Sequence, residues 1–238
     1  MTSGRLIVLT ILSAAFLPRV ASATSFYAET FFSGDARGYT GDGDWAWNRY
    51  KGQCNAGDPI TGISSTSVGT VGFGSSLLPH AVLCSHGAYL VGSGQLGSSP
   101  PDPPPYGTER VHLLTNGADD RGDFATGNWD VFSGTIKAEC GFNEAVTGVA
   151  EADDGSHIIT AILCTWIQSE IDAAPSNCNT RFFSLTSDNR RSTSGGDWDG
   201  GYSKNQFGDS QILKGVSAVA NTGEIHAILC CSSQPDPH

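Results

Sequence analysis

Residues 43–47 read "GDWAW", and the same opening returns as "GNW" at 127–129 and "GDW" at 196–198. The chain has five tryptophans, and three of them, Trp45, Trp129 and Trp198, stand in this setting. An aspartate lies ten residues before each of these three tryptophans, and an arginine lies eight residues before. Self-similarity of this kind indicates a structural unit that the chain uses three times.

A glycine-centred stretch and a closing phrase follow each tryptophan. The stretch reads "ITGIS", "VTGVA" or "LKGVS", and the closing phrase reads "HAVLC", "TAILC" or "HAILC". In copies two and three the two pieces flank short Asn/Asp/Gly turns, a pattern that predicts a β-hairpin. A further strand is predicted before each aspartate, in "SFYAETFF", "RVHLLT" and "RFFSLT".

These units predict one all-β domain of pseudo-threefold symmetry over residues 24–238, with repeats at about 24–97, 108–171 and 178–234. The spacers "SSPPDPPPYG" and "DAAPSN" separate the repeats, because strand interiors do not tolerate proline. Thirty glycines and a single methionine also suit many short strands joined by turns. We expect roughly four to five strands in each copy.

Residues 1–23 predict a secretory signal peptide, with an apolar stretch from Leu6 to Leu17 and small residues at Ala21 and Ala23. No later stretch approaches the roughly 20 apolar residues of a membrane span. The net charge of −11 disfavours a nucleic acid or an anionic membrane as partner. We therefore expect a secreted, extracellular protein whose partners are glycans or components of a matrix or coat, without nucleic acid and without membrane insertion.

Seven cysteines in an exported chain predict disulfide bonds, with one cysteine left over. Cys54 and Cys140 both lie eight residues before the central glycine of their copies, and Cys84 and Cys164 both close those copies. Equivalent positions predict equivalent bonds, so we expect Cys54 to pair with Cys84 and Cys140 with Cys164. Phe207 stands at the first of these positions in copy three.

The third bond has two alternatives. Cys178 can reach Cys230 or Cys231 but not both, because adjacent residues of a strand face opposite sides of its sheet. We favour Cys231, which leaves Cys230 buried against Phe207 as a small apolar side chain.

The chain resembles the vitelline-membrane outer-layer protein family. The resemblance lies in "GDWAW" followed by a cysteine, in a "TG" strand with a closing strand that ends in cysteine, in "LTNG" before the second tryptophan, and in "LCC" near the C-terminus. It implies a β-prism whose three sheets come from the three repeats, and an extracellular coat or matrix protein associated with carbohydrate. A β-trefoil is the alternative architecture, although its repeats are usually shorter.

The tryptophan segments are candidate sugar sites. Aromatic rings stack on the apolar faces of sugars, while carboxylates and amides bond the hydroxyls. For the tryptophans shared by all copies we prefer a role as core anchors, with the preceding Asp or Asn capping a turn. Aromatic residues that differ between copies are freer to bind a ligand. The candidate residues are Tyr39, Asp44, Trp45, Trp47, Phe124, Asn128, Trp129, Asp197, Trp198 and Tyr202.

Acidic turns make calcium the one cofactor to consider, because this ion needs several converging oxygens. The candidate ligands are Asp42, Asp119, Asp153 and Asp154, but no string matches a twelve-residue calcium loop, and we otherwise expect no cofactor.

Catalysis has little support. No Gly-x-Ser-x-Gly motif occurs, and the chain offers three copies of one loop where an enzyme needs one asymmetric constellation. His80 and His226 share a position with Thr160, and we interpret them as strand-edge residues with local hydrogen bonds. The predicted function is non-catalytic, lectin-like carbohydrate binding. The alternative is a structural coat or protein-interaction module, followed by a carbohydrate-active enzyme.

Overall fold

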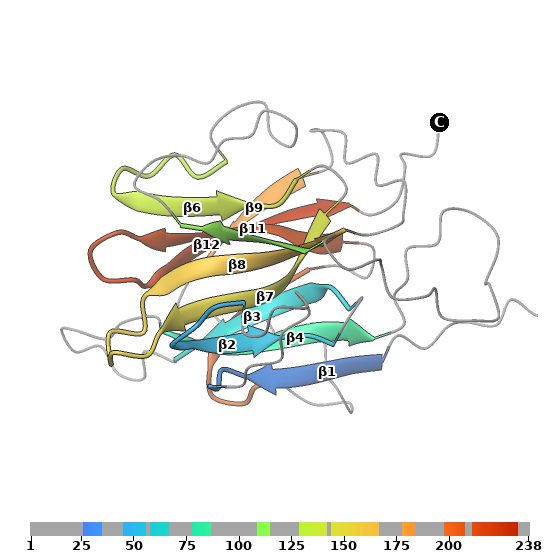
Figure 1. Cartoon of the computed structure of the whole chain (residues 1–238). Coiled ribbons are helices and arrows are strands. Elements are labelled where there is room, and N and C mark those ends of the chain that lie inside the picture. Colours follow the sequence, from blue (N-terminus) through green and yellow to red (C-terminus); the bar gives the residue numbers. More distant parts are fainter. Residues whose placement is uncertain are drawn as a thin grey trace, which may run out of the picture.

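A computed structural model of the chain has an all-β fold of three four-stranded antiparallel sheets (Figure 1). The predicted β-prism architecture is confirmed, and the β-trefoil alternative is wrong. In the described part of the chain no helix is long and apolar enough to cross a membrane. The predicted signal peptide lies outside the described residues. The described residues are 26–34, 45–55, 58–66, 78–86, 109–114, 129–141, 144–166, 178–183, 198–207 and 211–232.

The sheets are called A, B and C, and their strands are given in spatial order. Sheet A contains β1 (Phe26–Phe31), β4 (Pro79–His86), β3 (Ile60–Ser65) and β10 (Ser203–Gln206). Sheet B contains β2 (Arg49–Gln53), β7 (Glu144–Ala152), β8 (Ile159–Trp166) and β5 (Glu109–Leu113). Sheet C contains β6 (Thr135–Glu139), β11 (Gln211–Val219), β12 (Ile225–Ser232) and β9 (Cys178–Phe182).

Each sheet takes one edge strand from another repeat. Sheet A consists of three strands of the first repeat and β10 of the third. Sheet B joins β2 of the first repeat to three strands of the second, and sheet C joins β6 of the second to three strands of the third. Each repeat thus contributes one edge strand to the sheet of another repeat, so every sheet contains strands of two repeats.

The main apolar core lies between the sheets and draws on all three of them. Side chains alternate between the two faces of a strand, so half of each central strand points into this core. Representative members, all fully buried, are Ile63 and Val82 of sheet A, Val149 and Ile162 of sheet B, and Val216 and Ile228 of sheet C.

The outer face of each sheet is covered by the tryptophan of the repeat that supplies its edge strand. Trp198 packs on Ala81 and Leu83 of sheet A. In the same way, Trp45 packs on sheet B and Trp129 on sheet C. All three indoles are buried, with 8% or less of each residue exposed. The recurrent tryptophan therefore anchors the fold, as we expected for residues common to all copies.

In sheets B and C a central glycine makes room for the indole. A Cβ added at Gly148 would lie 2.9 Å from Cζ2 of Trp45, and one added at Gly215 would lie 3.2 Å from Cζ2 of Trp129. A glycine within a strand often marks such a close approach. The indoles of Trp45 and Trp129 thus account for Gly148 and Gly215, whereas a Cβ added at Gly62 would lie 3.0 Å from Gln206 Cβ and 3.2 Å from the carbonyl oxygen of Asn205.

The disulfides are those that the repeat alignment predicts. Cys54 follows β2 of sheet B and is bonded to Cys84 in β4 of sheet A. Cys140, which follows β6 of sheet C, is bonded to Cys164 in β8 of sheet B. Each of these bonds therefore links an edge strand that joins the sheet of another repeat to a sheet of its own repeat. Three disulfides are typical of proteins that fold in an oxidising environment.

The third disulfide joins Cys178 to Cys231 within sheet C, which is the favoured alternative. Cys230 takes part in none of the three bonds and is buried. Its burial is as predicted, and it belongs to the same central cluster as Phe207.

Candidate functional site

Each sheet has a β-bulge in its closing strand. In sheet A the register shifts between Pro79 and Ala81, so that His80 is the extra residue. The same irregularity makes Thr160 the extra residue in sheet B and His226 the extra residue in sheet C. A bulge turns a side chain away from the regular alternation of the strand and often serves a functional site. The bulged residues are therefore the starting point for the candidate site.

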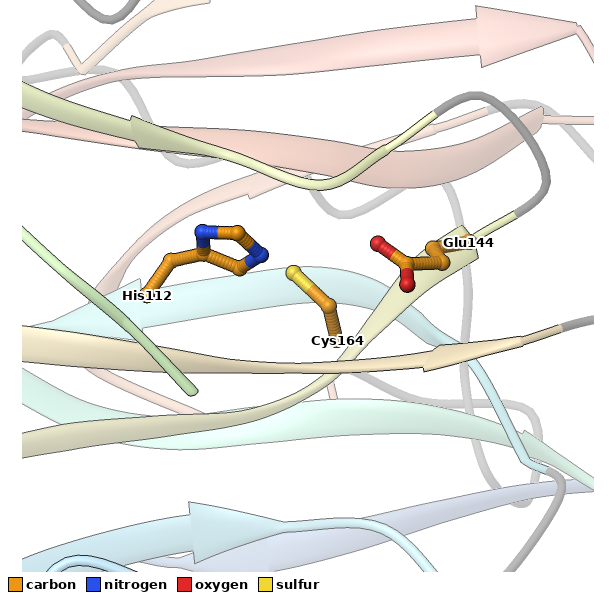
Figure 2. Close-up of side chains that lie close together, drawn as sticks. All are labelled: His112, Glu144 and Cys164. Atoms are coloured by element: carbon orange, nitrogen blue, oxygen red, sulfur yellow. The ribbon is translucent and has the colours of Figure 1, made fainter. Parts of the chain in front are cut away.

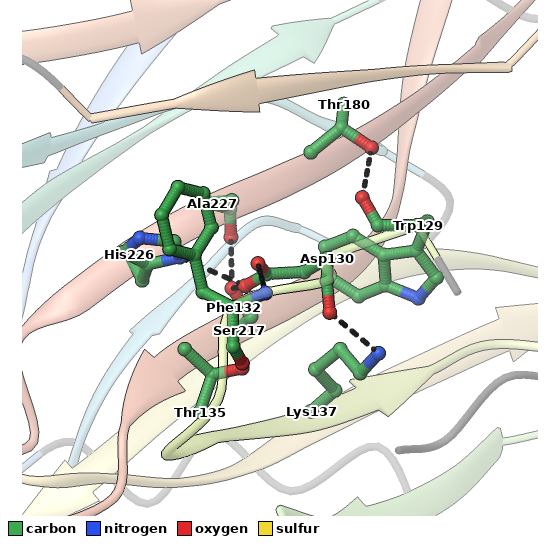
Figure 3. A network of polar contacts seen from close by, with 9 residues as sticks. All are labelled: Trp129, Asp130, Phe132, Thr135, Lys137, Thr180, Ser217, His226 and Ala227. Atoms are coloured by element: carbon green, nitrogen blue, oxygen red, sulfur yellow. Dashed lines mark hydrogen bonds and ion pairs between the residues drawn. The ribbon is translucent and has the colours of Figure 1, made fainter.

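In sheet C the bulged histidine is held by an aspartate of the second repeat (Figure 3). His226 Nδ1 lies 2.8 Å from Asp130 Oδ2, and Ser217 Oγ donates to the same oxygen at 2.5 Å. The backbone N–H of Phe132 donates to Oδ1 of Asp130 at 3.3 Å. The Asp130 side chain is fully buried, so these bonds satisfy a carboxylate that water does not reach. They also fix the orientation of the His226 ring.

Two phenylalanine rings flank His226. The ring centroid of Phe132 lies 4.8 Å from that of His226, and the centroid of Phe182 lies 5.4 Å from it. Phe132 is 57% exposed and Phe182 is 44% exposed. We call Asp130, Phe132, Phe182 and His226 site C. Its two phenylalanine side chains are exposed to solvent beside a histidine of fixed orientation.

Sheet A has an equivalent cluster built with an aspartate of the third repeat. His80 Nδ1 lies 3.0 Å from Oδ2 of Asp199. The Tyr202 ring stacks on His80 with centroids 3.7 Å apart and planes within 5°. Phe31, 52% exposed, meets the His80 ring edge-on at 5.2 Å. We call Phe31, His80, Asp199 and Tyr202 site A.

The third equivalent position, on sheet B, lacks both members of the ionisable pair. Thr160 stands in place of the histidine, and Ala46 stands in place of the aspartate that follows the tryptophan. Arg49 Nε donates to Thr160 Oγ1 at 3.2 Å. Exposed Leu113 takes the place of the outer-strand phenylalanine. Sites A and C thus have no counterpart of the same chemistry here.

A buried lysine supports each tryptophan loop. Lys137 Nζ donates to the carbonyl oxygen of Asp130 at 3.1 Å, and Lys204 Nζ donates to that of Asp199. Lys51 makes the corresponding bond in the first repeat, at 3.1 Å. These bonds hold the backbone of the residue that follows each tryptophan. Our sequence reasoning missed the lysines, although "KGQC", "KAEC" and "KNQF" place each of them three residues before the Cys54, Cys140 or Phe207 position.

Asp130 and Asp199 were not among the residues that we selected from the sequence. The expectation that His80 and His226 make local hydrogen bonds is wrong. We considered the residue before each tryptophan, whereas Asp130 and Asp199 come after it. The partners of His80 and His226 are not local, because 119 and 96 residues separate the bonded pairs. The sequence pattern that could have identified the aspartates is "WD", which occurs in the second and third repeats but not in the first, where Ala46 follows Trp45.

The other predicted sugar-binding residues have mixed outcomes. Tyr202 lies in site A. Trp47 is 77% exposed and so remains open to a ligand, whereas the indoles of Trp45, Trp129 and Trp198 are buried and offer little surface for stacking. The remaining candidates, which lie outside the described residues, are Tyr39, Asp44, Phe124, Asn128 and Asp197.

The calcium candidates are tested only in part. Asp153 and Asp154 are exposed in the turn between β7 and β8. Asp154 Oδ1 accepts hydrogen bonds from the backbone N–H and the hydroxyl of Ser156, which lower the pKa of Asp154. This arrangement gives Asp154 a role in the turn. Asp42 and Asp119 lie outside the described residues.

Within the described residues, one group of metal-ligand types lies close together (Figure 2). Ligand atoms of His112, Glu144 and Cys164 lie within 4.8 Å of one another. However, the Cys164 sulfur is bonded to Cys140, and the Glu144 carboxylate is paired with Arg110 at 2.6 Å. A disulfide sulfur is not the thiolate that metals bind. This group therefore does not fit a metal site.

A second histidine–carboxylate pair lies in the β7–β8 hairpin. His157 Nδ1 lies 3.1 Å from Glu151 Oε1, and the His157 ring stacks on Tyr50. Burial raises the pKa of Glu151 to about 7, although the bond from His157 acts in the opposite direction. Glu151 thus titrates near neutral pH because it is buried.

Site C brings a serine, a histidine and an aspartate together. In site C the Ser217 hydroxyl donates to Asp130 and not to His226, so serine, histidine and aspartate do not form a relay that could activate a nucleophile. Comparison with known protein families, curated proteins and solved structures finds no match to this chain. The functional assignment therefore depends on the geometry of sites A and C.

Proposed function

We propose that the protein is a secreted, non-catalytic, lectin-like carbohydrate-binding protein of a cell surface or extracellular matrix, and that sites A and C bind the sugar. One observation carries the proposal: in both sites aromatic side chains that are exposed or partly exposed flank a histidine that a buried carboxylate holds in place. Aromatic faces stack on sugar rings, and a few well-placed polar groups supply orientation and specificity.

The Nε2 atoms of His80 and His226 are available to hydrogen-bond a ligand. Nδ1 of each ring is bonded to aspartate, and among the described residues none bonds the Nε2 of His80 or of His226. Because the aspartate fixes the ring, Nε2 has a defined direction toward a sugar hydroxyl. Little ordering entropy is then lost on binding, which favours affinity.

The properties of the whole chain agree with this proposal. A net charge of −11 suits neutral or cationic partners. The disulfides and the predicted signal peptide at residues 1–23 support secretion. The three antiparallel sheets agree with the resemblance to the vitelline-membrane outer-layer family, and we include membership of that family, with its association with carbohydrate, in the proposal.

A glycan screen tests the proposal. The protein is applied to a glycan array and to chitin and other insoluble polysaccharides, with and without a chelator. We expect saturable binding that Phe132→Ala and Tyr202→Ala each weaken while thermal unfolding stays close to that of the wild type. A blank screen at high protein concentration would reject carbohydrate binding. Binding that disappears with the chelator would assign a role to calcium.

A structural coat or protein-interaction module is the second candidate. Val131 and Phe132 are both exposed, and neighbouring exposed apolar side chains also suit a protein partner. A blank glycan screen together with saturable binding to an extracellular matrix protein would favour this candidate. Release of reducing sugar from a bound polysaccharide would instead indicate a carbohydrate-active enzyme.

A further inference from the structure

We infer that each chain has two glycan sites, on different sheets of the prism, and therefore crosslinks glycan chains. This inference rests on the proposed function and adds the number of sites and its consequence. It comes from a comparison of the three equivalent positions on sheets A, B and C, which hold His80, Thr160 and His226.

Sites A and C are assembled from the same four parts. Each contains a bulged histidine, the aspartate that follows a buried tryptophan, an aromatic residue of the same tryptophan loop, and a phenylalanine of the outer strand. The phenylalanines occupy equivalent registers, because Phe31 pairs with Ala81 and Phe182 pairs with Ala227. Matching construction indicates matching ligands.

The aspartate and the loop aromatic reach each site from a different repeat than the histidine. Asp199 belongs to the third repeat and meets His80 of the first. Asp130 belongs to the second repeat and meets His226 of the third. Both pairs exist because the strand that follows each tryptophan loop, β10 or β6, is hydrogen-bonded into the sheet of another repeat.

The sheet B position lacks both the histidine and the aspartate. Thr160 and Ala46 cannot form the ionisable pair, and the Arg49 side chain bonds the threonine in its place. A histidine or an aspartate alone at this position would lack its partner, and an unpaired buried charge is costly. Thr160 and Ala46 are thus mutually consistent, and the described part of the fold has two such histidine sites where its symmetry allows three.

The two sites lie on the outer faces of two different sheets. Sheet A is in the lower part of Figure 1 and sheet C is in the upper part, and their inner strands β3 and β11 contact each other in the core. Each site lies on the outer side of its sheet, where Trp198 or Trp129 covers the strands. A branched or polymeric glycan could occupy one site while a second chain occupies the other. Bivalent engagement of this kind raises avidity without any new contact.

Titration calorimetry measures the number of sites. The probe is the free, monovalent form of the glycan that gives the strongest signal in the screen, and the protein is the intact secreted chain. We expect two sites per chain for the wild type, one for His80→Ala, one for His226→Ala, and at least ten-fold weaker binding for the double variant. Tyr202→Ala and Phe132→Ala should each remove one site without disturbing a buried aspartate.

Thr160→Ala and Leu113→Ala are the matched controls, because they alter the same positions on sheet B. Both should keep two sites of unchanged affinity. Beads coated with the same glycan should aggregate with the wild type and bind either single-site variant without aggregating. One site or three sites per chain, or loss of a site in Thr160→Ala, would overturn this inference while leaving carbohydrate binding intact. A blank screen would overturn carbohydrate binding itself.

Discussion

His226 of the third repeat and Asp130 of the second repeat are joined by a hydrogen bond of 2.8 Å across 96 residues of sequence. The bond forms because β6, which follows the loop of Asp130, pairs with β11 of sheet C. The candidate site is therefore a product of strand exchange. A repeat by itself would contain the histidine or its aspartate partner, but not the bonded pair.

The two neighbouring tryptophans of the first repeat should differ sharply in their contribution to stability. Trp45 is buried on sheet B, whereas Trp47 is 77% exposed. We expect Trp45→Ala to lower the free energy of unfolding by roughly 3–5 kcal/mol, and Trp47→Ala to change it by no more than about 0.5 kcal/mol. Urea denaturation measures both values. Equal losses would contradict the distinction between anchor and surface residue.

Gly148 should not accept a side chain. Its added Cβ would lie 2.9 Å from Trp45 Cζ2 and 3.2 Å from Leu163 Cβ, so Gly148→Ala should cost about 1–3 kcal/mol through overpacking. Gly200→Ala is the control, because nothing lies within 4 Å of the Cβ that it would add. We expect the control to unfold within about 0.5 kcal/mol of the wild type. A tolerant Gly148 would mean that the indole does not lie on the strand.

The cysteines should give one disulfide map. Peptide mapping without reduction should recover Cys54 with Cys84, Cys140 with Cys164, and Cys178 with Cys231. Buried Cys230 should react with a thiol reagent only in denaturant. Replacing both Cys54 and Cys84 by alanine should lower the free energy of unfolding by about 2–5 kcal/mol. Any exchange of partners would contradict the equivalence of the repeats.

Glu151 should make stability depend on pH between acid and neutral conditions. Burial raises its pKa from 4.5 to about 7, so the folded state binds its proton more tightly than the unfolded state. The associated stability is complete below about pH 4.5 and is lost as the pH rises toward 7. Glu151→Gln should flatten this part of the curve of unfolding free energy against pH.

Asp154→Asn is the contrasting variant for this measurement. The hydrogen bonds from Ser156 lower the pKa of Asp154, so any contribution of that residue is lost as the pH falls. Asp154 is exposed, and its effect should be slight. A pH profile of Glu151→Gln identical to that of the wild type would contradict the raised pKa of Glu151.

The sequence was informative wherever one local pattern recurs. Trp45, Trp129 and Trp198 could be identified as anchors because all three repeats contain them, and Cys54 with Cys84 could be paired by position. Trp47 and Tyr202 were selected because symmetry does not explain them, and Tyr202 does lie beside His80. Lys51, Lys137 and Lys204 were not selected from the sequence because a lysine is normally on the surface. Only the structure shows that they are buried beneath the tryptophan loops.

By itself, then, the sequence determined the number of repeats, the all-β class, the positions of the anchoring tryptophans and the pairing of the cysteines. These properties depend on patterns that each repeat contains in full. Only the tertiary structure decided which sheet each of β2, β6 and β10 joins, and hence that Asp130 and Asp199 hold His226 and His80. A hydrogen bond between residues 96 or 119 positions apart leaves no local periodicity in the chain, so it becomes visible only when the sheets are assembled.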